Sequence, residues 1–72
     1  MVNVLKLKGK IAEAGLSIPK LASQMDIDKA TLYRKLQCGG ENLLIKDVDT
    51  IARILNLSGE DINDIFFNDK VA

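Results

Sequence analysis

The 72-residue sequence predicts an all-α domain of five helices. Hydrophobic residues make up 47% of the chain but aromatic residues only 4%. The apolar positions are mostly Leu, Ile and Val spaced three or four residues apart, which is typical of helices, whereas strands alternate. Residues that end helices separate these segments. We expect residues 1–67 to form a single compact domain and residues 68–72 to be a frayed C-terminal tail.

The first helix is expected over residues 4–14. Asn3 should cap it, because the Asn side chain can accept a hydrogen bond from an unpaired backbone N–H group. Gly15 should end it in the left-handed conformation. Three residues at helical spacing should face the core: Leu7, Ile11 and Ala14.

The second and third helices are short and separated by a tight turn. Ser17 should cap a helix that ends near Met25, and Asp28 should cap a helix that continues to about Gln37. The turn itself is Asp26-Ile27. The apolar positions of this unit are Leu21, Ala22, Met25, Ile27, Leu32 and Leu36. Two short helices with a small residue at their contact and an apolar residue in the turn are typical of a helix-turn-helix.

Two further helices should complete the domain. The stripe of Val48, Ile51, Ala52 and Leu55 predicts a helix over residues 46–55, whose start is poorly capped. Residues 58–61 resemble a capping box, so a fifth helix should begin there. Ile62, Ile65 and Phe66 should close the core from that helix.

The composition excludes several classes of protein. Lys6, Lys8 and Lys10 interrupt the apolar N-terminus, so we expect no signal peptide, no membrane span and a cytoplasmic location. The chain has no histidine and one cysteine, Cys38, which we interpret as an ordinary helix-end residue. No metal site, cofactor, catalytic residue or enzyme activity is therefore predicted.

Charge is divided unevenly along the chain, although the net charge is zero. Residues 1–37 contain seven Lys or Arg and three Asp or Glu, which gives +4, and residues 38–72 contain three and seven, which gives −4. This division predicts a basic half that faces the phosphates of a nucleic acid and an acidic half that points away from them. The alternative is an ordinary solvated surface.

The outward face of the third helix is the candidate site. A step of about 100° per residue from Leu32 and Leu36 places Ala30, Arg34 and Gln37 opposite the core. The candidates for contact with DNA bases are Lys29, Ala30, Thr31, Tyr33, Arg34 and Gln37. Arg34 can donate two hydrogen bonds to guanine and Gln37 can pair with adenine, while Ala30 or the Thr31 methyl group suits thymine. For Tyr33 there are two alternatives to contact with a base: its ring could pack at the mouth of the core, or its hydroxyl could bond a phosphate.

Phosphate contacts are expected from residues at the edges of the same unit. The candidates are Ser17, Lys20, Lys29 and Lys35, together with backbone N–H groups at the start of the second helix. Arg34 and Lys35 could instead be ordinary surface charges. Asp28 is better explained as a helix cap than as a reader of cytosine, because phosphates repel carboxylates.

At these residues the chain resembles the Cro and lambda-repressor class of helix-turn-helix regulators, also called the XRE family. Leu21-Ala22, Ile27 and Thr31-Leu32 match the class pattern. Residues 31–36, together with Leu-Asn-Leu-Ser and Ile-Phe-Phe-Asn-Asp, look like small regulators of phages and prophages of Gram-positive bacteria. The match departs from the class at Asp26, where a Gly is usual, and at Ile18, where a Gln often contacts phosphate.

The resemblance implies a five-helix lambda-repressor-like fold and a sequence-specific regulator, a repressor or Cro-like switch, that reads the major groove of double-stranded operator DNA. The alternative is a protein-interaction module, such as an antirepressor that binds another phage regulator. The class generally binds as a two-fold dimer with half-sites roughly 34 Å apart. Leu43, Leu44, Phe67 or the fifth helix could supply a weak dimer patch that forms only on DNA, whereas Phe66 should close the core of the monomer.

Overall fold

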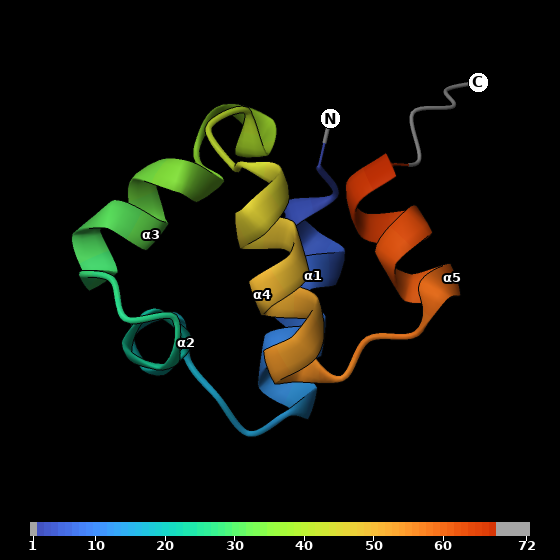
Figure 1. The fold of residues 1–72 in the computed structure, drawn as a ribbon, viewed down its shortest axis with the longest axis horizontal. Coiled ribbons are helices and arrows are strands. Elements are labelled where there is room, and N and C mark those ends of the chain that lie inside the picture. The colour runs from blue at the N-terminus through green and yellow to red at the C-terminus, as the bar shows by residue number, and fades with distance from the viewer. Residues whose placement is uncertain (1, 68–72) are drawn as a thin grey trace.

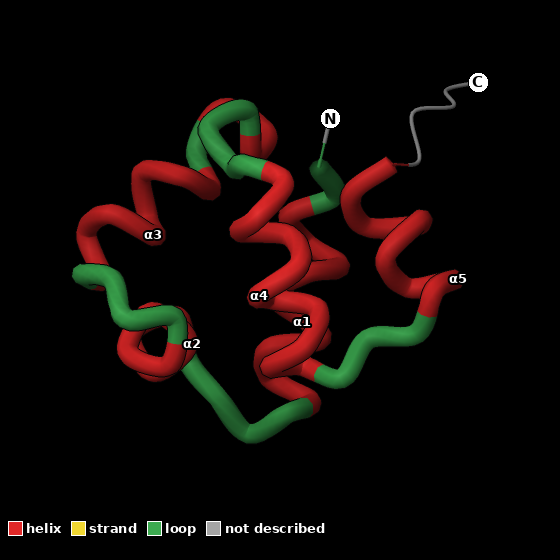
Figure 2. Tube along the Cα trace, viewed as in Figure 1, coloured by secondary structure: helices red, strands yellow, loops and turns green. Residues whose placement is uncertain are grey.

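The computed structural model describes residues 2–67. Five α-helices follow one another, and no strand is present in this part of the chain, which confirms the predicted all-α fold (Figure 2). The helices are α1 (Val4–Glu13), α2 (Ile18–Gln24), α3 (Lys29–Leu36), α4 (Ile45–Leu55) and α5 (Gly59–Ile62). A 3-10 turn, η1 (Cys38–Gly40), precedes α4, and α5 continues into a π-helical turn, η2 (Asn63–Phe67). The tail predicted at residues 68–72 lies outside the described residues.

The helices are arranged around a central pair. Figure 1 shows α4 crossing in front of α1, with α2 and α3 on one side and α5 on the other. In the same view α2 is seen end-on while α3 lies across the picture, so their axes cross steeply. The Cα radius of gyration is 11.2 Å, close to the value of about 11 Å expected for a compact domain of this length.

The core takes residues from every helix except the short α5, with η2 contributing in its place. Its buried members are Leu7, Ile11, Leu21, Ala22, Leu32, Leu36, Ile51, Ile65 and Phe66. These include Leu21, Ala22, Leu32 and Leu36, which the sequence pattern placed inside. Burial of each large aliphatic side chain stabilises the fold by about 1.5 to 3 kcal/mol relative to exposure. The core therefore holds α2 and α3 on the α1–α4 pair.

Four helix starts have the predicted side-chain caps. Backbone N–H groups donate to Asn3 Oδ1 at α1, to Ser17 Oγ at α2 and to Asp28 Oδ2 at α3. At α5 the capping box is complete, because Asp61 N donates to Ser58 Oγ at 3.0 Å and Ser58 N donates to Asp61 Oδ2 at 3.3 Å. Each cap typically contributes about 1 kcal/mol.

Three helix ends share one arrangement. Gly15, Asp26 and Asn56 have φ angles of +76°, +62° and +55°. In each case the next residue donates its backbone N–H to a carbonyl inside the helix, as Ile27 does to Ala22 at 3.0 Å. This is the Schellman motif, in which a left-handed residue is followed by an apolar one that returns to the core.

Two details of the predicted helices are wrong. Ala14 is exposed rather than inward-facing, because α1 ends at Glu13 and Ala14 is its C-cap. The start of α4 is also not poorly capped. Leu44 has no polar side chain, but its backbone N–H donates to Asp47 Oδ2 at 2.9 Å. Usually the side chain of the N-cap residue accepts a hydrogen bond from a backbone N–H inside the helix. Here the side chain of Asp47, inside the helix, accepts one from the backbone N–H of the N-cap residue Leu44.

Candidate nucleic-acid interface

The turn between α2 and α3 sets the geometry of the candidate site. Met25 is the C-cap of α2, and Asp26 takes the left-handed conformation at the position where the class that the sequence resembles usually has Gly. Asp26 N donates to Ser23 O at 3.1 Å. Asp28 then caps α3 through Ala30 N at 3.3 Å. Because these bonds are all local, the turn holds the start of α3 at a defined angle to α2.

The predicted base-contacting side chains share the accessible side of α3, with one exception. Lys29, Ala30 and Arg34 are exposed, Tyr33 is 47% exposed and Thr31 is half-buried. Arg34 Nη2 donates to Thr31 Oγ1 at 3.4 Å, so these two side chains lie together one turn apart. The accessible part of α3 therefore offers a guanidinium next to a threonine side chain, and it also exposes the Tyr33 phenol.

The exception is Gln37. The sequence pattern placed it inside the third helix, but α3 ends at Leu36 and Gln37 is extended, with φ −74° and ψ 164°. The chain reverses at once through Cys38 and Gly39, whose φ angles are both positive. The predicted alignment of Gln37 with Arg34 on a helical face is therefore wrong, although the side chain remains exposed.

The candidate phosphate contacts differ in their availability. Lys20 and Lys29 are exposed. Ser17 Oγ accepts a bond from Lys20 N at 3.3 Å, which leaves its O–H group able to donate. Lys35 is different, because its Nζ lies 3.0 Å from Asp47 Oδ2 and its side chain is only 19% exposed. Lys35 would have to leave this ion pair to contact DNA.

The two oppositely charged halves of the sequence do not face in opposite directions. Lys6 pairs with Asp64 at 3.0 Å, Lys10 with Asp61 at 3.5 Å and Lys35 with Asp47 at 3.0 Å. The expected separation of a basic half from an acidic half is therefore wrong, because folding joins the halves by ion pairs. Within residues 2–67, the cations outside any ion pair are Lys8, Lys20, Lys29, Arg34 and Lys46.

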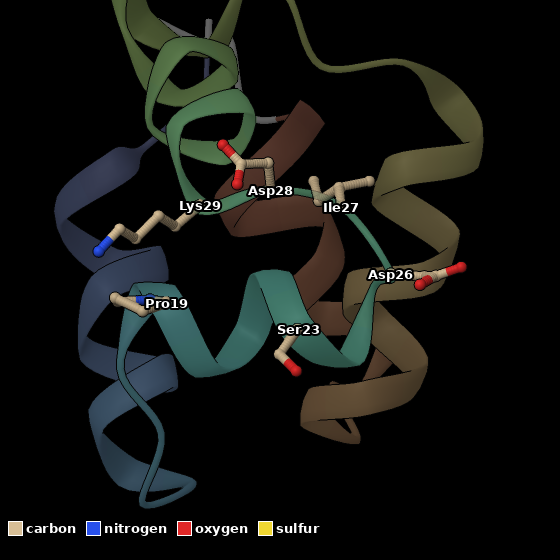
Figure 3. Close-up of a pocket in the computed structure, with 6 residues that line it drawn as sticks. All are labelled: Pro19, Ser23, Asp26, Ile27, Asp28 and Lys29. Atoms are coloured by element: carbon tan, nitrogen blue, oxygen red, sulfur yellow. The ribbon is translucent and has the colours of Figure 1, made fainter.

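An open hollow of about 520 Å³ lies between α2 and the start of α3. Figure 3 shows its lining, in which Lys29 extends toward Pro19 at one end while Asp26 lies at the other. Because an anion avoids the carboxylates of Asp26 and Asp28, only the Pro19 end suits a phosphate.

A second hollow, of about 360 Å³, begins at the same proline and continues along α1. Lys8 and Tyr33 both line it. Sequence reasoning missed Lys8 as a candidate, because its spacing from the helix-turn-helix gives no sign of proximity. The only signal in the sequence is its charge.

Within residues 2–67 no helix combines the length and apolar character that crossing a bilayer requires.

A comparison with known protein families agrees with the geometry of the helix-turn-helix. No curated protein and no solved structure matches the chain. The family model for the Cro/C1-type helix-turn-helix DNA-binding domain matches residues 6–68, which include α2 to α5, the turn described above and all of α1 except Val4 and Leu5. The chain thus belongs to the Cro/C1-type helix-turn-helix DNA-binding family, as the resemblance in its sequence implied.

Proposed function

We propose that this DNA-binding domain is a sequence-specific transcription regulator, a repressor or Cro-like switch, that places α3 in the major groove of its operator. The observation that supports this most directly is the exposed face of α3. Its one guanidinium, Arg34, is exposed and is in no ion pair within residues 2–67, so it can bind a partner without breaking an ion pair.

The base contacts proposed for α3 follow from the chemistry of its side chains. The planar fork of Arg34 matches guanine O6 and N7. Ala30 and the methyl group of Thr31 suit the methyl group of thymine. Lys29 and Tyr33 complete the helix face, and Gln37 would reach a base, adenine for example, from the extended segment after the helix.

The phosphate contacts proposed for the domain are those of Ser17, Lys20 and Lys29 at the exposed edges of α2 and α3. Such contacts set the register of the protein on the duplex but do not read its sequence. Lys35 is a weaker candidate because the structure pairs it with Asp47.

A two-fold dimer on DNA is part of the proposal, because one recognition helix covers few base pairs. Leu44 is 52% exposed and Phe67 54% exposed, so both can supply an apolar patch. Leu43 packs partly against the core, and Phe66 is buried as expected. Formation of this dimer only on the operator, action in the cytoplasm and an origin in phages all remain predictions.

The test is selection of bound duplexes from a random DNA library at near-physiological salt, with wild type and Arg34→Ala compared. We expect the wild type to enrich a half-site or palindrome. Arg34→Ala should relax one position of that motif and weaken binding to the cognate duplex by about 1 to 3 kcal/mol.

Arg53→Ala is the matched control, since it removes the same charged group from α4, outside the helix-turn-helix. The Arg53 side chain is 72% exposed, and its one ion-pair partner within residues 2–67 is Asp49 on its own helix. Its loss should leave the motif unchanged. If folded wild type enriches no sequence, sequence-specific regulation is excluded, and the alternative of a protein-interaction module such as an antirepressor becomes the preferred function.

A further inference from the structure

The hollow beside Lys8 is built from three parts of the chain that meet at the start of α2. Its lining comes from α1, from the connection between α1 and α2, and from α3: Lys8, Ile11, Ala12, Leu16, Ser17, Ile18, Pro19 and Tyr33. Ile11 is only 2% exposed and forms part of its floor. Three groups on the lining can donate a hydrogen bond, namely the Lys8 amine and the Ser17 and Tyr33 hydroxyls.

The charge at this hollow is uncompensated. No residue within 2–67 forms an ion pair with Lys8, although Lys6 and Lys10 on the same helix are both paired with acidic residues of η2 or α5. Among residues 2–67, no carboxylate lines the hollow. An exposed amine beside two hydroxyls, with no carboxylate among the lining residues, attracts an anion.

The shape and lining suit one kind of anion in particular. The hollow has a mixed lining, with apolar surface from Ile18 and Pro19 next to the three donors. A DNA backbone has the same mixture, since each deoxyribose presents C–H groups next to a charged phosphate. Tyr33 also belongs to α3, so the hollow adjoins the helix that is proposed to read the duplex.

We propose that Lys8, with the Ser17 and Tyr33 hydroxyls, forms a DNA-backbone site that holds one phosphate while the adjacent sugar packs on Ile18 and Pro19. This inference rests on the proposed function, because the ligand is the backbone of the duplex that α3 reads. The site lies next to Lys29, whose side chain extends toward Pro19 from the other side (Figure 3). Together Lys8 and Lys29 would contact the backbone on both sides of the start of α2.

The experiment compares Lys8→Gln with Lys10→Gln by measuring affinity for the selected duplex over a range of salt concentrations. Each phosphate neutralised by a protein cation contributes about 0.9 to the slope of log affinity against log salt. We expect Lys8→Gln to reduce this slope by about that amount and to leave the selected motif unchanged. Lys10→Gln removes the same charge from the same helix, but Lys10 already pairs with Asp61 and Glu13, so its slope should equal that of wild type.

Tyr33→Phe provides a second measurement that does not alter charge. It should weaken binding to the selected duplex a few-fold without changing the salt slope, because only a neutral hydroxyl is lost. Ser17 is unsuitable for this purpose, since its hydroxyl also caps α2. Circular dichroism should confirm that each variant is folded.

The outcomes separate this site from the proposed function. Equal slopes for Lys8→Gln and wild type, in a protein that still selects its motif, would overturn the backbone site and leave sequence reading intact. Competition by inorganic phosphate at constant ionic strength would identify a site for free phosphate instead. If wild type selects no duplex at all, the proposed function itself has failed.

Discussion

At the scale of single residues, Gly40 has no room for a side chain. Its φ is +77°, and an added Cβ would lie 2.7 Å from Val2 Cβ and Cγ2. Gly40→Ala therefore combines left-handed strain with overpacking, and we expect it to lower the free energy of unfolding by about 2 to 4 kcal/mol. Urea unfolding followed by circular dichroism measures this change.

Gly9→Ala is the control at the same scale. Gly9 lies within α1, and a Cβ added there meets no atom within 4 Å. Removing a helical glycine should stabilise the protein by about 0.5 to 1 kcal/mol. Equal midpoints for Gly40→Ala and wild type would contradict the close approach of Val2. The sequence alone does not predict this contact between Gly40 and the N-terminal residue Val2.

At the scale of helices, the sequence predicts the features, such as helix caps, that depend on residues close to one another in the chain. The caps at Asn3, Ser17, Asp28 and Ser58 were all identified, because each forms within three residues of its partner. The end of α3 was misplaced at Gln37, since helical periodicity does not show that Cys38, a non-glycine residue, takes a positive φ.

The connection between α3 and α4 gives a prediction at this scale. Asp47 is 7% exposed, accepts a hydrogen bond from Leu44 N at 2.9 Å and forms an ion pair with Lys35 Nζ at 3.0 Å. Asp47→Ala removes both the hydrogen bond and the ion pair, so we expect a loss of about 2 to 3 kcal/mol in unfolding free energy. Lys35→Met removes only the ion pair and should cost less, because Leu44 N keeps its acceptor.

The double variant tests whether the two residues act as a pair. Lys35→Met with Asp47→Ala should be more stable than the sum of the single losses predicts, by about 1 kcal/mol, because neither charge is left unpaired. Additive losses in urea unfolding would mean that Asp47 acts only as the cap of α4, and that the ion pair does not help to hold α3.

At the scale of the whole molecule, the sequence predicts the fold class but not the pairing of charges. The +4 and −4 halves were expected to face apart, yet Lys6, Lys10 and Lys35 each meet an acidic residue from the second half. Periodicity identifies which face of a helix is buried, but not which helix lies beside it. The hollow at Lys8 was missed for the same reason, since it needs the packing of α1 against α2 and α3.

We expect Asp61, the acidic member of one of these long-range pairs, to make stability depend on pH. The hydrogen bond from Ser58 N holds the pKa of Asp61 below its ordinary value of 3.8, and the charge of Lys10 acts in the same direction. Asp61, and then Glu13, raises the pKa of Lys10 above 10.5. A carboxyl group whose pKa is lower in the folded than in the unfolded state stabilises the fold above the unfolded value. That contribution is lost as the pH falls through the folded value.

Asp61→Asn keeps an oxygen that can accept from Ser58 N but removes the charge. We expect a lower melting temperature than wild type at neutral pH, and a difference that shrinks as the pH falls below 3.8, where the wild-type carboxylate becomes protonated. Glu60→Gln, which removes a neighbouring exposed carboxylate in no ion pair within residues 2–67, should show little difference at any pH. Thermal unfolding across the acid range measures both variants. If the Asp61→Asn difference stays constant below pH 3.8, the ion pair between α1 and α5 contributes nothing, and Asp61 stabilises the fold only as a neutral hydrogen-bond acceptor in the capping box.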